Sequence, residues 1–292
     1  MMSIFQSVAK MNFFKLSLFL AGFLITSSAS ARHGATLPGG MLFPAFATAS
    51  LTNPAALAND WRKEIQVLYS PPLQPNEPHS YLASGAAGSG RLGMNLGYSG
   101  SSQEGVAFHN VFAGVAARIK RLSVGLGTRI MGIGSNIETA LDAAGIFQLT
   151  RRIHLGGVLY DSLGTRQLGM GIGWLSHDRF SLQVDLLVPF DFNQHLVSSE
   201  YAVTAAGVWY FYRFGFSLGT RYNQISSLGR DEKSISLNVG TFVRLAPNWS
   251  VIAFYNSAPT SVSVGLGWNL APSSQQLIEF FQDKSQKQIE QK

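Results

Sequence analysis

The sequence contains no cysteine and few charged residues. Without cysteine the chain can form neither a disulfide nor a thiolate metal site, which is compatible with an exported protein that needs neither. Only 13% of the 292 residues are charged, whereas charged residues make up about a quarter of an ordinary soluble domain. Much of the surface is therefore expected to face something other than water.

Long apolar runs are missing after the first 31 residues. A membrane-spanning helix needs about 18 or more consecutive apolar residues, and runs such as Ala205 to Tyr212 are much shorter. The sequence therefore argues against a helical membrane protein. The formal net charge of +6 is modest and dispersed, whereas nucleic-acid-binding proteins cluster Lys and Arg on one face. We expect no nucleic-acid partner.

Catalytic and cofactor motifs are also lacking. The six histidines are scattered, with no pair at metal-ligand spacing, and the chain has no Gly-x-Ser-x-Gly elbow. The glycines recur at period two rather than at a strand-to-helix turn, which excludes a phosphate-binding loop. His195 near Ser198 and Ser199 is the only local catalytic candidate, and an ordinary polar loop explains it better. We expect no enzyme, no cofactor and no metal.

An alternating pattern dominates the rest of the chain. From Thr260 to Leu270, large apolar residues alternate with small or polar ones, as in a strand whose side chains point to opposite faces. The pattern recurs with almost no helix between, and predicts an all-β transmembrane antiparallel barrel of about 14 strands. The expected strands are 64–69, 81–87, 91–99, 106–119, 121–131, 138–149, 153–160, 167–175, 179–190, 201–212, 214–222, 234–245, 249–256 and 260–270.

Short and long links alternate between these strands. Lys120-Arg121 and Ala246-Pro247-Asn248 are tight, whereas the links at 191–200 and 223–233 are long. Outer-membrane barrels have short periplasmic turns and longer outer loops. We therefore expect both termini in the periplasm of a Gram-negative bacterium, with the barrel in contact with outer-membrane lipid and lipopolysaccharide.

The chain divides into four expected parts. Residues 1–31 read as a signal peptide, with Lys10 and Lys15 before an apolar run and Ala29-Ser30-Ala31 as the cleavage signal; a start at Met11 would also give a complete signal. Residues 32–63 do not alternate and are expected to form a hatch or plug, and residues 64–270 form the barrel. Residues 271–292 form a periplasmic tail with apolar residues at helical spacing.

Two sets of barrel residues follow from the strand parity. Trp and Tyr prefer membrane interfaces, and the expected belts at the two rims contain Trp174, Trp209, Trp249, Trp268, Tyr98, Tyr160, Tyr222 and Tyr255. The expected inward groups are Asp185, Gln183, Asp142, Arg129, Arg221, Arg118 and Arg244. Because buried charges are paired, Asp185 is expected to pair with an inward arginine. Many other inward residues are glycines, which leave room for another backbone.

Residues 49–58 read Ala-Ser-Leu-Thr-Asn-Pro-Ala-Ala-Leu-Ala, with Asn53 as an expected helix N-cap and Pro54 in the first turn. The segment resembles the N-terminal signature of the FadL-like outer-membrane transporters of long-chain fatty acids and other hydrophobic compounds. The resemblance implies a 14-stranded barrel with an N-terminal hatch, and assigns Asn53, Pro54 and Ala55, followed by Leu57, to that hatch. This chain is shorter than those transporters, and their ligand-pocket residues cannot be matched in it.

The leading hypothesis is passive transport of small hydrophobic molecules such as fatty acids, gated by the hatch. The alternative is a non-transporting barrel, which serves as an anchor or as a secretion or assembly accessory for a periplasmic protein bound by the tail. A narrow polar porin ranks third, and an enzyme last.

Overall fold

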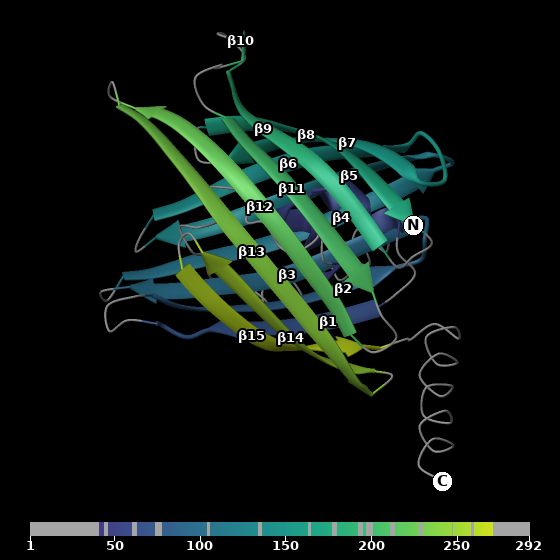
Figure 1. Cartoon of the computed structure of the whole chain (residues 1–292), viewed down its shortest axis with the longest axis horizontal. Coiled ribbons are helices and arrows are strands. Elements are labelled where there is room, and N and C mark those ends of the chain that lie inside the picture. Colours follow the sequence, from purple (N-terminus) through teal and green to yellow (C-terminus); the bar gives the residue numbers. More distant parts are fainter. Residues whose placement is uncertain are drawn as a thin grey trace, which may run out of the picture.

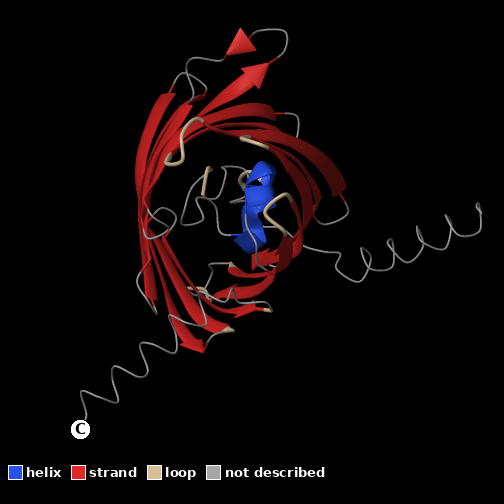
Figure 2. Ribbon diagram, turned by 90° about the vertical axis from the view of Figure 1, so that its right-hand side faces the viewer, coloured by secondary structure: helices blue, strands red, loops and turns tan. Residues whose placement is uncertain are grey.

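The computed structural model describes residues 41–43, 46–59, 63–73, 78–103, 106–133, 136–162, 165–176, 180–191, 195–196, 201–210, 214–227, 230–246, 248–257 and 260–270. The expected leader (1–31) and tail (271–292) lie outside this part of the chain. In the described part, the predicted fold is confirmed as a closed antiparallel barrel of 14 strands. The strands form a ring in Figure 2 and run steeply across the molecule in Figure 1.

The barrel strands follow one another around the ring in chain order. They are β1 (Lys63–Ser70), β2 (His79–Gly88), β3 (Leu92–Gln103), β4 (Val106–Ile119), β5 (Leu122–Ile133), β6 (Asn136–Gln148), β7 (Ile153–Ser162), β8 (Thr165–Ser176), β9 (Phe180–Asp191), β11 (Tyr201–Tyr210), β12 (Phe214–Ser227), β13 (Arg230–Ala246), β14 (Trp249–Ser257) and β15 (Thr260–Asn269). A two-residue strand, β10 (His195–Leu196), pairs only with the end of β9. Pairing of β1 with β15 closes the ring.

The two faces of the wall have opposite polarity. Val67 is paired with Leu266 across the closing seam, and each is 50% exposed on the outer face. The neighbouring inward residue Gln66 is buried, as are inward Ser84 and Asn95. Apolar side chains outside and polar ones inside are the arrangement of a barrel that meets lipid with its outer face. Among the described residues, no helix is long and apolar enough to cross a membrane.

Several strands extend further than the alternation predicts. The expected link 223–233 is largely strand, because β12 continues to Ser227 and β13 begins at Arg230, with Gln224 paired to Lys233. The backbone ladder does not require apolar side chains, so polar residues continue it where the hairpin leaves the apolar layer. The alternation of apolar and polar residues therefore predicts only the part of each strand that crosses the apolar layer, and the strands extend beyond that part.

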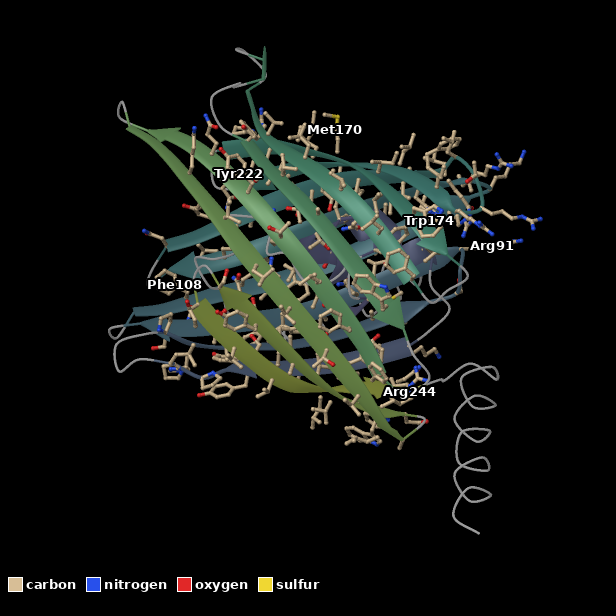
Figure 3. All side chains as sticks on the ribbon, viewed as in Figure 1. Arg91, Phe108, Met170, Trp174, Tyr222 and Arg244 are labelled. Atoms are coloured by element: carbon tan, nitrogen blue, oxygen red, sulfur yellow. The ribbon has the colours of Figure 1, made fainter. Side chains whose placement is uncertain are left out.

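Aromatic residues gather where the short turns lie. Trp174 and Trp209 both contact Phe180, with ring centroids 5.6 and 4.8 Å apart, and Trp249 stacks on Trp268 at 5.3 Å. Figure 3 shows Trp174, Arg91 and Arg244 at this end of the barrel.

The other end carries tyrosines on the outer face. Tyr81 and Tyr98 lie with ring centroids 5.5 Å apart, and Tyr201 and Tyr222 with centroids 5.8 Å apart. Tyr255 is 40% exposed on β14. Phe108 and Tyr222 mark this end in Figure 3.

Candidate functional site inside the barrel

A segment of the chain before the first strand lies inside the ring of strands, where Figure 2 shows its helices. We call its described residues, 41–43 and 46–59, the inner segment. It contains two 3-10 helices, η2 (Phe46–Leu51) and η3 (Pro54–Asn59). Asn53 begins η3, because its Oδ1 accepts a hydrogen bond from the Ala55 N–H at 3.0 Å, and Pro54 suits the first helical position, where no N–H is needed. Asn53, Pro54, Ala55 and Leu57, the residues expected in the hatch, are all buried here.

Glycines of the wall allow the inner segment to pack closely against the strands. A Cβ added to Gly125 on β5 would lie 2.5 Å from the Pro54 carbonyl carbon and 2.7 Å from the Ala55 Cα. One added to Gly93 on β3 would collide with the backbone of Leu57. Real Cβ atoms do not approach other atoms so closely, so only glycine allows η3 to lie against β3 and β5.

Polar side chains of the wall donate hydrogen bonds to backbone and side-chain oxygens of the inner segment. Tyr160 on β7 donates its hydroxyl hydrogen to the Thr52 carbonyl oxygen, between η2 and η3. Asn95 Nδ2 donates to the Ala47 carbonyl at 3.2 Å, and Ser123 Oγ donates to Asn59 Oδ1 at 2.7 Å. Buried carbonyl groups need such partners, so these wall residues replace the water that an isolated segment would bind.

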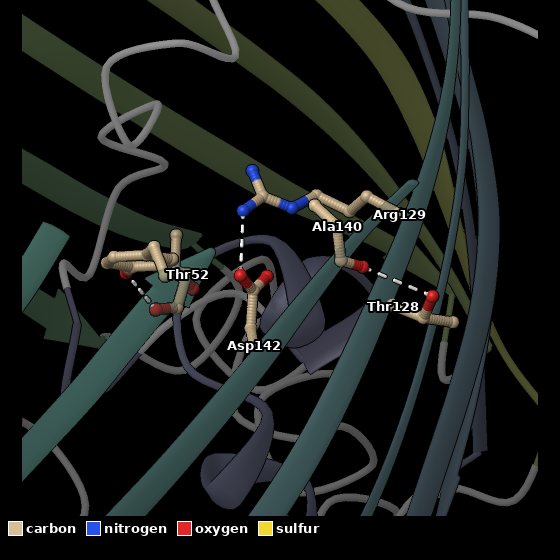
Figure 4. Close-up of polar contacts among 6 residues, drawn as sticks. Thr52, Thr128, Arg129, Ala140 and Asp142 are labelled. Carbon is tan, nitrogen blue, oxygen red and sulfur yellow. Dashed lines mark hydrogen bonds and ion pairs between the residues drawn. The ribbon is translucent and has the colours of Figure 1, made fainter. Parts of the chain in front are cut away.

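An ion pair lies next to this anchor. Arg129 Nη2 is 2.8 Å from Asp142 Oδ1, and the two side chains are 5% and 0% exposed. Figure 4 shows the pair near Thr52. The Arg129 guanidinium also lies 5.8 Å from the centre of the Tyr160 ring. Asp142 and Tyr160 are register partners on β6 and β7, so the pair and the tyrosine form one buried cluster.

The position of Tyr160 corrects the sequence prediction, which placed this residue in the outer aromatic belt. Tyr160 is 7% exposed and shares the inward face of β7 with Val158, because side chains two apart point the same way. An aromatic residue near a strand end resembles a belt residue whichever face it occupies. The parity of β7 was the signal that could have identified it.

A second anchor holds the start of the inner segment. Gln183 Oε1 accepts hydrogen bonds from the N–H groups of Leu42 and Phe43, both at 3.1 Å. Asp185 Oδ2 accepts one from the Met41 N–H at 3.0 Å and another from Gln183 Nε2 at 2.9 Å. We call Gln183 and Asp185 the β9 clamp.

The clamp also corrects a prediction. Asp185 was expected to pair with an inward arginine, but the hydrogen bonds found for its carboxylate come from the Met41 backbone and Gln183. Asp142 is the acid that has the arginine partner. The sequence could not separate the two acids, because the backbone N–H that satisfies Asp185 lies 144 positions away in the chain.

The other expected lumen arginines lie elsewhere. Arg221 on β12 is buried and donates from Nε to Asn223 Oδ1 at 2.7 Å. Arg118 is half-buried near a short turn, where its Nε donates to the Lys120 carbonyl at 3.0 Å and its Nη2 to Gln148 Oε1 at 2.8 Å. Arg244 is half-buried at the same end of the barrel. Arg118 and Arg244 therefore lie near the rim and belong neither to the Arg129–Asp142–Tyr160 cluster nor to the β9 clamp.

The anchors share one side of the barrel. Each wall residue named above as a partner of the inner segment lies on a strand between β3 and β9. Strands β11 to β15 form a separate arc, which we call the second arc, and β1 and β2 lie between it and β3. The inward positions of the second arc carry small, hydroxyl, amide and a few apolar side chains: Ala202, Thr204, Ala206, Ser217, Gly219, Ser236, Asn238, Phe242, Ser250, Ile252, Phe254, Ser261 and Ser263. Arg221 and Arg244 are the inward charged residues found on this arc among the described side chains.

Solved structures of outer-membrane barrels share the fold of this protein. No family model and no curated protein matches this sequence. The structure is similar to the CymD monoaromatic hydrocarbon channel (TM-score 0.58, 12% identity, 79% of this chain and 94% of that chain). It is also similar to a bacterial polysaccharide outer membrane secretin (TM-score 0.50, 8% identity, 73% of this chain and 99% of that chain). The fold is therefore that of Gram-negative outer-membrane barrels.

Among the described residues, no group of three or more His, Cys, Asp or Glu side chains is placed to bind a metal ion. The cluster of Arg129, Asp142 and Tyr160 is engaged with itself and with the inner segment. The inward side chains of β3 to β9 can therefore hold the inner segment against this side of the wall through a few hydrogen bonds.

Proposed function

We propose that this protein is a passive outer-membrane channel for small hydrophobic molecules, such as hydrocarbons and fatty acids, and that the inner segment is the hatch that controls the passage. The observation that carries the proposal is the one-sided attachment of the inner segment. Its anchors lie on β3 to β9, so solute would pass between the segment and the second arc. A few hydrogen bonds, each with a net value of about 1 kcal/mol, hold the segment and permit it to shift.

The second arc favours neutral solutes. Hydroxyl groups, amides and small side chains dominate its inward face, and the Arg129–Asp142 pair on the other side is mutually compensated. A channel for ions or charged solutes would gain from fixed charges along its path. The second arc has few fixed charges, so it would not offset the free energy that an ion loses when it sheds its water.

Apolar contacts on the same arc support a hydrophobic solute. Phe242, Ile252 and Phe254 point inward from β13 and β14, and aromatic side chains are common in small-molecule sites. The likeness in fold to a channel named for monoaromatic hydrocarbons agrees with this choice. For a fatty acid, the guanidinium of Arg221, the more deeply buried of the two inward arginines on this arc, would bind the carboxylate, because arginine presents several donors to such an anion.

An uptake assay tests the proposal. Gram-negative cells that lack their own hydrocarbon and fatty-acid channels would express the full-length protein, and uptake of radiolabelled toluene and oleate would be measured over seconds. Ser263→Trp places a large side chain on the inward face of the second arc, whereas its matched control Val264→Trp places the same side chain on the outer face.

We expect the wild type and Val264→Trp to raise uptake of at least one compound about tenfold over empty cells, and Ser263→Trp to abolish the increase. Uptake no faster than in empty cells, with the barrel folded by heat-modifiable gel mobility, would reject the channel. In that case, recovery of a periplasmic protein that is lost on deletion of residues 272–292 would support the anchor or accessory function instead.

A further inference from the structure

Three neighbouring turns at one end of the barrel carry exposed basic side chains. The turn between β2 and β3 carries Arg91, that between β4 and β5 carries Lys120 and Arg121, and that between β6 and β7 carries Arg151 and Arg152, all exposed. We call these five residues the basic rim. No aspartate or glutamate occurs from Ser89 to Arg91, from Arg118 to Arg121 or from Leu149 to His154. Figure 3 shows Arg91 and nearby nitrogen-rich side chains projecting from this end.

Hydrogen bonds tie the three turns to one another. The Arg118 N–H donates to the Arg91 carbonyl at 2.7 Å, and the Gln148 N–H donates to the Arg121 carbonyl at 2.8 Å. Arg121 Nη1 also donates to the Leu149 carbonyl at 3.4 Å. The turns therefore hold a fixed spacing, and the positive charges cannot move far apart to relieve their repulsion.

The backbone at Lys120 shows where one of these charges is placed. Lys120 has a φ of 55°, and it is alone among the described non-glycine residues in having a positive value. Side chains with a Cβ rarely adopt this conformation, and Gly or Asn usually occupies it in a two-residue hairpin turn. Here Arg118 supports the turn by donating to the Lys120 carbonyl, and the turn presents an ammonium group at its tip.

Apolar residues on the outer face place the basic rim at the surface of a lipid layer. Leu92, Ile119 and Leu122 flank these turns and are 64%, 69% and 44% exposed. In a barrel they face hydrocarbon, so the adjacent basic groups lie at the level of lipid headgroups. Long Lys and Arg side chains commonly reach the interface in this way, and a cluster of them attracts anionic lipid.

We propose that the basic rim binds the phosphate groups of anionic phospholipids in the membrane leaflet at the short-turn end of the barrel. The proposal requires the barrel to span a membrane but is independent of transport. Short turns face the periplasm in outer-membrane barrels, so the leaflet is the inner one, where the ligands would be phospholipids such as phosphatidylglycerol. Each guanidinium or ammonium would donate hydrogen bonds to phosphate oxygens.

The test compares two double variants of the full mature protein that remove the same charge. Lys120→Gln/Arg151→Gln changes the basic rim, and Arg166→Gln/Lys233→Gln changes exposed basic residues at the other end. Each protein is reconstituted in phosphatidylethanolamine nanodiscs with one phosphatidylglycerol in ten lipids, and the co-purified lipid is counted by native mass spectrometry. We expect several-fold enrichment of phosphatidylglycerol on the wild type and the control. The rim variant should lose it, and 1 M salt should weaken it on the wild type.

Lys120→Gly is a second variant for the case that the double variant folds poorly. It removes one charge of the basic rim, and glycine adopts a positive φ without steric strain. It should fold at least as well as the wild type and still bind less phosphatidylglycerol. Equal phosphatidylglycerol binding by the wild type, the rim variant and Lys120→Gly would overturn the proposal. So would a parallel nanodisc series with lipid A in which the rim binds lipid A but not phosphatidylglycerol, since that end would then face the outer leaflet.

Discussion

Tyr160, on the inward face of β7, donates its hydroxyl hydrogen to the carbonyl oxygen of Thr52 in the inner segment. Thr52 joins the two 3-10 helices, so this bond attaches the middle of the segment to the wall. Its donor lies beside the Arg129–Asp142 ion pair. Tyr160 thereby connects the ion pair to the inner segment, so a substitution in the ion pair should also change how firmly the segment is held.

Tyr160→Phe should weaken the attachment without emptying the space. The phenyl ring remains and only the hydroxyl is lost, which leaves the buried Thr52 carbonyl without this donor, so we expect a loss of about 1 to 2 kcal/mol. Urea unfolding of the refolded protein measures it. Tyr81→Phe removes a hydroxyl that contacts Tyr98 on the exposed outer face, and it should cost much less. Equal effects of the two substitutions would contradict the anchoring function of Tyr160.

Gly125→Ala should displace η3, whereas Gly219→Ala should not. A methyl at position 125 would overlap the backbone of Pro54 and Ala55, but one at position 219 would meet its neighbours at 3.6 to 3.8 Å, an ordinary contact distance. Both glycines are inward wall positions, so the pair isolates the effect on the segment. Chymotrypsin cleaves after large apolar residues such as Leu51 and Leu57 of the inner segment. Its cleavage of this segment, followed by mass spectrometry, should accelerate several-fold for Gly125→Ala alone. Unchanged protection in both variants would show that η3 does not rest on β5.

Removing one member of the Arg129–Asp142 pair should destabilise the barrel more than removing both. Arg129→Met leaves a buried carboxylate without its arginine partner, and such changes cost about 3 to 5 kcal/mol. Arg129→Met/Asp142→Leu removes both charges, and we expect it to recover most of that loss. Urea unfolding of the two single variants and the double variant completes the cycle. Additive losses would mean that the two side chains act independently.

Gln183→Leu should release the start of the inner segment. Two N–H groups, those of Leu42 and Phe43, would lose their acceptor while the side-chain volume stays nearly constant. Because the protein has no cysteine, a single Leu42→Cys reports on the change through its rate of maleimide labelling, which is slow when the residue is buried. Labelling should accelerate in Gln183→Leu and stay slow in Asn238→Leu, a similar change on the second arc. No acceleration in either would argue against the β9 clamp.

The wall of this barrel could be predicted from sequence because consecutive residues of a strand point to opposite faces, so the polarity of each face can be read from the strand itself. Val67 and Leu266 meet lipid and Gln66 does not, and that difference is visible in consecutive residues. The expected strand from 106 to 119 coincides with β4. Hairpin ends were less predictable, as at Ser227 and Arg230, because polar residues carry a ladder outside the apolar layer without alternating.

The interior was harder to predict because its partners are far apart in the chain. Inward glycines indicated that another backbone comes close, and Gly93 and Gly125 do touch η3. Nothing in the residues around Asp185 showed that its carboxylate would accept the Met41 N–H. Tyr160 was misplaced because an aromatic residue near a strand end suits either a lipid interface or a lumen anchor, and only its parity distinguishes the two.

If the inner segment is a hatch, it should obstruct the lumen while it is in place, and single-channel conductance in a planar bilayer measures this obstruction. The mature protein would be compared with a variant that lacks residues 32–60, each shown to be folded by heat-modifiable gel mobility. We predict that the mature protein is silent or opens only briefly, and that the deletion variant conducts steadily, because removing the segment leaves the lumen without its hatch. A folded deletion variant that stays silent, or a mature protein that already conducts as much as the variant, would contradict a hatch function of the inner segment.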